Sequence, residues 1–226
     1  MTAVSRYRFV ARACIGISVA LVAASVATHY VAYRLQVADP GTDVIPALAW
    51  LDVNAERNVP TAWSASLLLL AAIAAGVLAV RGASGGRGWS LVAATAGFLA
   101  LDESLELHER LAPAGKAVVG QLLHFAWVVP GAAAGAVVGT LLLLRLRAQP
   151  ALVRRRLVLA GITYLTGALL LETVSGVVLR HDGPREPYIA VTALEELLEM
   201  AGASLLLATV LAVPRRSAKD HADLAP

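Results

Sequence analysis

The chain has 226 residues, of which 58% are hydrophobic and 15% are charged, and its formal net charge is +3. Soluble domains are roughly 45–50% apolar and about 25% charged, so this composition excludes a disordered chain and a nucleic-acid-binding protein. The single cysteine, Cys14, excludes an internal disulfide framework and a zinc site built from cysteines.

Apolar stretches along the chain predict membrane spans, each of which needs about 20 mostly apolar residues. Three stretches without Asp, Glu, Lys or Arg are long enough: 13–33, 58–80 and 117–144. Three more reach that length only together with the acidic residues beside them: 88–101, 157–171 and 200–214. We therefore predict an all-α, polytopic membrane helix bundle with six transmembrane helices, near residues 10–34, 62–80, 88–111, 119–144, 156–179 and 189–213.

The basic residues predict the orientation of these spans. Most of the 19 Lys and Arg residues precede the first span or follow the second, fourth and last spans. Because loops rich in Lys and Arg stay on the cytoplasmic side, we expect both termini in the cytoplasm. The prediction is a multi-pass protein of the cell (inner or plasma) membrane, with a single transmembrane bundle over 1–216 and a flexible cytoplasmic tail over 217–226. A cleaved signal peptide over the first apolar run is the alternative for the N-terminus.

Polar residues gather in the half of the spans that lies away from the cytoplasm. Helical phase places Asp102, Glu106 and Glu109 on one face of the third span and points His108 towards a different neighbour. Glu195, Glu196 and Glu199 repeat the spacing of Asp102, Glu103 and Glu106. The candidate site residues are Asp102, Glu103, Glu106, His108, Glu109, His124, Glu172, Glu195, Glu196 and Glu199.

So many acids at one depth require a compensating partner. An ionised carboxylate at mid-bilayer costs at least about 2.5–3.5 kcal/mol, so the group needs protons, cations or a water-filled cavity. A divalent metal ion of unknown identity would use carboxylate oxygens and histidine nitrogens. This predicts a metal-dependent membrane enzyme acting on a lipid-like or lipid-soluble substrate, with one free Glu as general base.

Two other functions are consistent with the same residues. A proton- or cation-coupled transporter or channel would use Glu106, Glu172 and Glu199 as a relay. A structural partner subunit would use the acids to bind another membrane protein, and some of them would then lie at the membrane interface. Membrane lipids are the expected surroundings in each case, and assembly as a homo-oligomer or with a partner membrane protein is left open.

Two short segments carry a resemblance to a known group of proteins. They are L-D-E-S-L-E-L-H-E at 101–109 and E-E-L-L-E-M-A-G at 195–202. Together they resemble uncharacterised bacterial multi-pass membrane proteins with an L-D-E-x4-H-E helix end and a later E-E-x2-E-M-x-G segment. The resemblance implies a shared site in a bacterial inner-membrane protein and assigns no chemistry to it.

Overall fold

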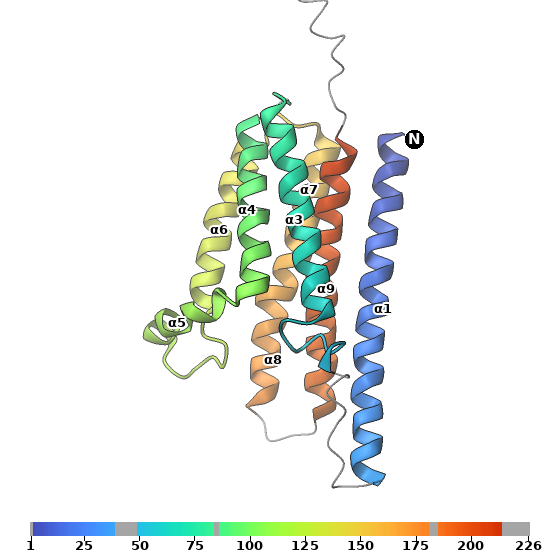
Figure 1. The fold of residues 1–226 in the computed structure, drawn as a ribbon. Helices are drawn as coiled ribbons and strands as arrows, with labels where there is room; N and C mark the ends of the chain where they lie inside the picture. Colours follow the sequence, from blue (N-terminus) through green and yellow to red (C-terminus); the bar gives the residue numbers. More distant parts are fainter. Residues whose placement is uncertain (1, 39–48, 84–85, 181–184, 214–226) are drawn as a thin grey trace, which may run out of the picture.

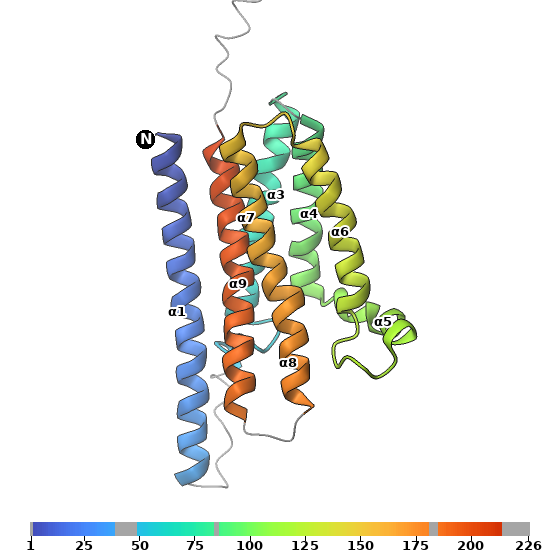
Figure 2. The same cartoon turned by 180° about the vertical axis from the view of Figure 1, so that it is seen from behind.

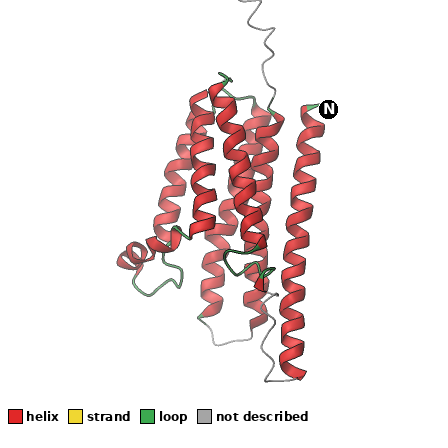
Figure 3. Ribbon diagram, in the orientation of Figure 1, coloured by secondary structure: helices red, strands yellow, loops and turns green. Residues whose placement is uncertain are grey.

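A computed structural model describes residues 2–38, 49–83, 86–180 and 185–213 (Figure 1). These residues form helices joined by turns, and no strand occurs among them (Figure 3). The all-α prediction is therefore confirmed for the described part of the chain. The tail predicted over 217–226 lies outside the described residues.

The described helices run up and down as long rods in one bundle (Figures 1 and 2). The rods are α1 (Ala3–Ala38), α3 (Val59–Val80), α4 (Gly86–Leu105), α6 (Val128–Arg145) and α9 (Arg185–Ala212). A further rod is continuous through α7 (Ala151–Leu165), a π-helical turn (Thr166–Leu171) and α8 (Glu172–Leu179). A 3-10 turn (His108–Leu111) and the short helix α5 (Ala112–Val119) connect α4 to α6.

Four of the described helical segments are long and apolar enough to cross a membrane. They are Ala3–Leu35, Val59–Val80, Val128–Arg145 and Ala151–Leu179. Large apolar side chains such as Leu69, Leu70 and Ile73 on α3 are exposed on the bundle surface. A water-soluble bundle would bury such side chains, whereas lipid accepts them. Helices α4 and α9 carry most of the candidate acidic residues and run beside these four segments.

Helix α9 is the central element, because it packs against α1, α3, α7 and the π-helical turn. Its approach to α7 is close because each partner presents a glycine. A Cβ atom at Gly202 would lie 2.6 Å from the backbone N of Tyr164. A Cβ atom at Gly167, in the π-helical turn, would lie 2.7 Å from the carbonyl O of Glu195. Small residues allow such backbone contact between helices in a membrane.

The core between the rods is apolar and consists of two clusters. One cluster joins α3, α4, α7 and α9 through residues that include Leu67, Leu68, Tyr164 and Leu207. The other surrounds Trp89, whose side chain is fully buried near the start of α4. Burying a Leu side chain contributes about 1.5–3 kcal/mol, so these contacts hold the four helices together.

The two ends of the bundle differ in charge. At the basic end, where α1 begins and α9 ends, Arg6 donates a hydrogen bond to the carbonyl O of Leu211 at 3.2 Å. The Arg156 guanidinium lies 3.8 Å from the centroid of the Tyr7 ring at the same end. At the opposite end, which we call the acidic end, α3, α6 and α9 begin and α4 and α8 end.

The connection between α4 and α6 corrects two predicted boundaries. Helix α4 ends at Leu105 rather than at 111, because Glu106 takes a φ of 52°, in the left-handed region that interrupts a helix. Helix α6 begins at Val128 rather than at 119, because α5 ends at Val119, the following Gly120 has a φ of 59°, and the chain then loops back. The apolar sequence of 119–127 therefore belongs to a connection and not to a rod.

Candidate functional site

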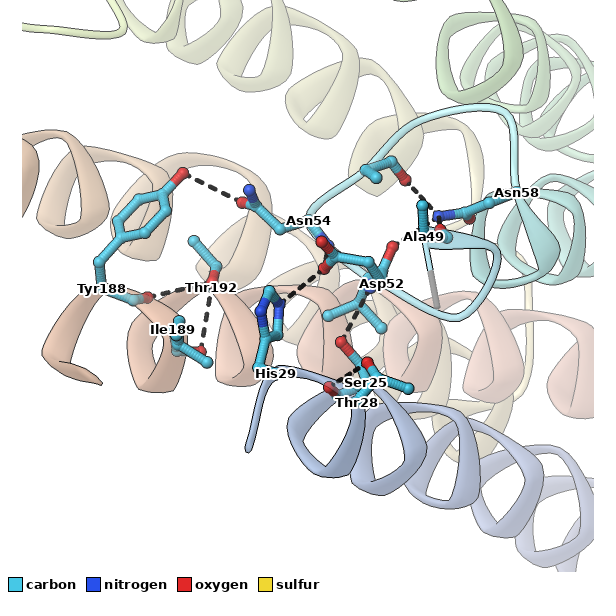
Figure 4. Close-up of polar contacts among 12 residues, drawn as sticks. Ser25, Thr28, His29, Ala49, Asp52, Asn54, Asn58, Tyr188, Ile189 and Thr192 are labelled. Carbon is cyan, nitrogen blue, oxygen red and sulfur yellow. Dashed lines mark hydrogen bonds and ion pairs between the residues drawn. The ribbon is translucent and has the colours of Figure 1, made fainter. Parts of the chain in front are cut away.

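A loop over residues 49–58, which we call the cap loop, covers the start of α3 at the acidic end (Figure 4). Asn58 organises it from the N-cap position of α3, where its Oδ1 accepts hydrogen bonds from the N and Oγ1 of Thr61, each at 3.1 Å. The Asn58 amide Nδ2 donates to the carbonyl oxygens of Ala49, Asp52 and Ala55. One buried side chain thus closes the loop and starts the helix.

The cap loop is attached to two other helices (Figure 4). On the α1 side, Ser25 Oγ accepts a hydrogen bond from Val53 N at 3.0 Å, and His29 Nε2 lies 3.0 Å from Asp52 Oδ1. On the α9 side, the Tyr188 hydroxyl donates to Asn54 Oδ1 at 3.0 Å. The loop therefore bridges α1 and α9 at the acidic end of the bundle.

The cap loop brings two charged residues to the site, and neither of them is among the residues predicted from the sequence. The Arg57 Nε lies 3.6 Å from Glu106 Oε1, and this ion pair joins the loop to the end of α4. The side chain of Glu56 is exposed to the outside of the cap loop, and part of it packs against the protein. Partial burial, together with the negative charge of Glu106, raises the pKa of the Glu56 carboxyl.

Asp102 and His108 form a pair at the end of α4. Asp102 Oδ1 accepts a hydrogen bond from the backbone N of His108 at 2.7 Å, and Asp102 Oδ2 lies 3.2 Å from His108 Nδ1. Burial lowers the pKa of His108, but the hydrogen bond and charge of Asp102 outweigh it, so the pKa is raised. The prediction that His108 faces a different neighbour is wrong, because the chain leaves the helix at Glu106 and folds back onto Asp102.

Trp127 connects this pair to the bundle interior. Its ring lies 4.5 Å from the His108 ring, centroid to centroid. Its indole Nε1 donates a hydrogen bond to Glu172 Oε1 at 3.1 Å. Glu172 is the first residue of α8, directly after the π-helical turn. Such turns inside α-helices occur frequently at functional sites, because they reposition the side chains that follow.

The deepest acidic residues come from α4, α8 and α9. We call this group the carboxyl cluster: Glu103, Glu172, Glu195, Glu196 and Glu199. Its members lie near one another, since the strongest electrostatic neighbours of Glu196 and Glu199 are other carboxyl groups of the site.

Within the carboxyl cluster, Glu195 and Glu172 are neighbours. The Glu195 side chain is 6% exposed, and its carboxyl group contacts that of Glu172 and lies near the Ser175 hydroxyl. Its Oε2 atom is buried and has no hydrogen-bond donor among the described residues. Two ionised carboxylates can only accept hydrogen bonds, so a proton or a cation between them would stabilise this arrangement.

A second buried group faces the cluster from α3. Ser64 is 1% exposed, and its Oγ has no hydrogen-bond partner within the described part of the chain. It is a neighbour of Glu103 without reaching hydrogen-bond geometry. Glu195 in the cluster and Ser64 beside it are therefore two buried polar groups with unused hydrogen-bonding capacity.

The remaining predicted residues lie at the rim or outside the cluster. Asp102, Glu106 and His108 are half-buried and have the partners described above. Glu109 and His124 are exposed, and the His124 ring packs edge-on against Phe125. The predicted span to 111 would place Glu109 on the same helix face as Asp102. Because the chain turns at Glu106, Glu109 does not lie on that face.

The geometry gives the predicted divalent-metal site no support. Among the described residues, no group of three or more His, Cys, Asp or Glu side chains is arranged to hold a metal ion. The described histidines have other surroundings, since His29 pairs with Asp52, His108 with Asp102, and His124 is exposed. The metal site remains a prediction from sequence.

Comparison with known families assigns the chain to a family but gives no activity for it. Residues 14–213 match the family described as Domain of unknown function (DUF8692). The chain belongs to this family. The match includes the whole carboxyl cluster and every described rod, with α1 included from Cys14 onwards, and it agrees with the resemblance to an uncharacterised family. No curated protein and no solved structure matches the chain.

Proposed function

We propose that this protein is a proton-coupled membrane transporter or channel of the bacterial inner membrane, in which the carboxyl cluster binds and releases protons. Six rods would cross the bilayer, with the basic end and both termini in the cytoplasm and the acidic end outside. The arginines at the basic end support this orientation, because Lys and Arg are retained on the cytoplasmic side.

The observation that carries the proposal is the contact between Glu172 and Glu195. The two carboxyl groups come from neighbouring helices, and Glu195 Oε2 is buried without a donor in the described structure. A proton between the two oxygens would satisfy both residues and remove one charge from the low-dielectric interior. Acids buried among membrane helices typically mark proton or ion pathways.

The arrangement also supports a route by which protons would reach the pair. His108 and Asp102 are half-buried at the acidic end, and Trp127 lies between His108 and Glu172. A histidine with a raised pKa exchanges protons near neutral pH. We propose that protons arrive from the outside through the His108–Asp102 pair and pass beside Trp127 to Glu172 and Glu195.

Purified protein in proteoliposomes that contain a pH-sensitive dye tests the proposal. An imposed pH gradient with a clamped membrane potential should drive proton flux through the wild-type protein. Glu195→Gln should reduce this flux at least tenfold, because the amide cannot take up a proton. Glu109→Gln is the matched control, since Glu109 is exposed outside the cluster, and it should retain the flux. Wild-type flux no greater than that of empty liposomes would contradict the transport function.

The metal-dependent enzyme is the second candidate. The unpartnered Oε2 of Glu195 would accept a cation as well as a proton, although no set of three ligands is arranged among the described residues. Elemental analysis of protein purified without chelator separates the two proposals. A stoichiometric metal that is lost in Glu195→Gln but kept in Glu109→Gln would favour the enzyme, and metal-free protein would exclude it.

A further inference from the structure

The connection between α4 and α6, residues 106–127, forms an elbow that projects from the side of the bundle. Both views of the ribbon show α5 beyond the ends of the neighbouring rods, near the level where α4 ends and α6 begins (Figures 1 and 2). A membrane whose polar boundary lies where α4 ends and α6 begins would place the elbow over the lipid beside the bundle, while α1, α8 and α9 continue past that level.

The elbow exposes apolar side chains that nothing in the described structure covers. Val118 is 73% exposed and Leu122 is 71% exposed, and Leu111 is exposed as well. The contact that holds α5 in place is made at Gly115. There a Cβ atom at Gly115 would overlap the carbonyl O of Ala126, so the backbones are packed directly together.

The charged residue of α5, Lys116, lies on a different side of this helix from Val118. Lys116 is exposed and lies two residues before Val118, which corresponds to about 200° around the helix axis. Arg110 and Glu109 are exposed just before α5 begins. An apolar side opposite a charged side is the pattern of a helix that lies in the plane of a membrane interface.

The elbow is also fixed firmly to the bundle, along one face of α8. Glu172 accepts the hydrogen bond from Trp127, Gly176 packs against Phe125, and Arg180 donates to the carbonyl O of Gln121. Glu172 and Gly176 in α8 and Arg180 directly after it are spaced four positions apart, so they lie along one side of the helix. The exposed side of the elbow is therefore held in a defined orientation relative to the rods.

We propose that the elbow lies on the outer leaflet at the acidic end, with Val118 and Leu122 inserted among the lipid chains and Lys116 turned towards the headgroups and water. The partner is the bilayer itself, since exposed apolar side chains at this level match the acyl–headgroup boundary and the lysine can reach the headgroups. This inference does not depend on proton binding by the carboxyl cluster.

Depth-dependent quenching of a fluorescent label tests the lipid contact. Because Cys14 is the chain's only cysteine, a Cys14→Ala background permits single-site labelling with an environment-sensitive dye. The labelled variants are Val118→Cys and Lys116→Cys, reconstituted in vesicles of phosphatidylcholine and phosphatidylglycerol. Ala148→Cys, exposed in the turn between α6 and α7, is the reference for a label in water.

The label at position 118 should emit at shorter wavelength than the label at 148. It should also be quenched at least threefold more by lipid-borne nitroxides placed near the headgroups. The label at 116 should be quenched more by aqueous iodide than the label at 118. Equal iodide quenching at 116, 118 and 148 would overturn the proposal, because the elbow would then lie in water. Loss of all lipid quenching in phosphatidylcholine alone would also overturn it, because the contact would then be electrostatic binding to anionic headgroups.

Discussion

The indole Nε1 of Trp127 donates a hydrogen bond to Glu172 Oε1 at 3.1 Å while its ring packs against the ring of His108. One side chain thereby touches both the half-buried Asp102–His108 pair and the carboxyl cluster. Its position depends on the elbow, which places His108 just after α4 and Trp127 just before α6. A change at Glu172 should therefore be detectable at the rim of the site.

Removing the Glu172 carboxyl group should release Trp127. In Glu172→Ala the indole N–H loses its acceptor, which should cost about 1–3 kcal/mol of unfolding free energy and alter the fluorescence of Trp127. Glu172→Gln keeps a side-chain oxygen as acceptor and should preserve most of the stability and the emission. Phenylalanine at the other three tryptophan positions isolates the signal. If the alanine and glutamine variants behave alike, the hydrogen bond does not position Trp127.

The Asp102–His108 pair should make stability depend on pH. Because the pKa of His108 is raised above its unfolded value of about 6.5, the pair stabilises the fold fully below that value. This contribution should be lost as the pH rises through the folded-state pKa. Asp102→Asn keeps an oxygen for the backbone N of His108 but removes the charge.

The thermal unfolding midpoint measured against pH checks this expectation. The difference between wild type and Asp102→Asn should be largest in acid and should shrink as the pH passes the folded-state pKa of His108. The NMR titration of the His108 ring supplies that pKa independently. A difference between the two proteins that stays constant across the pH range would show that the ion pair contributes nothing.

Gly167 should tolerate no side chain. A Cβ atom there would lie 2.7 Å from both the Glu195 carbonyl O and Glu199 Cγ, so Gly167→Ala must separate the π-helical turn from α9. We expect a loss of about 1–3 kcal/mol in denaturant unfolding. Gly161→Ala in α7 is the matched control, because nothing lies within 4 Å of its added Cβ, and it should be neutral or stabilising by up to about 1 kcal/mol. Equal effects of both substitutions would refute the close contact.

Asn58 should control the order of the cap loop. Asn58→Ala removes the N-cap of α3 and leaves three loop carbonyls without their shared donor, which should cost about 1–3 kcal/mol. Limited proteolysis should then cut the loop between 49 and 58 several times faster. Asn54→Ala removes only the hydrogen bond from Tyr188 and should change the cleavage rate less than Asn58→Ala. The account of the loop fails if the two variants are cut at the same rate.

The sequence predicted the rods well because membrane helices follow from apolar length. The span predicted over 62–80 corresponds to α3 and the span over 156–179 to α7 and α8, with boundaries that differ by a few residues. The same reasoning assigned Glu172, Glu195 and Glu199 to helical segments, and the structure places them on α8 and α9. These residues lie in regular helices, where position along the chain fixes height in the bundle.

The rest of the site depends on backbone turns and loops that cannot be predicted from the hydropathy of the sequence. The left-handed conformation of Glu106 ends α4 and turns His108 back onto Asp102, whereas helical phase had separated the two residues. The cap loop brings Glu56 and Arg57 to the site through tertiary contacts of Asn58. The N-cap pattern of Asn58 before Pro60 was a signal for this turn, but its three carbonyl partners are visible only in the fold.

The account rests on a shared proton between Glu172 and Glu195, and infrared difference spectroscopy measures it most directly. Wild-type protein taken from alkaline to acid pH should gain a carboxylic acid C=O band that shifts in heavy water. That band should be absent or much weaker in Glu195→Gln and unchanged in Glu109→Gln. A wild-type spectrum without a band that depends on Glu195 would contradict the account, because the two buried carboxyl groups would then not exchange a proton.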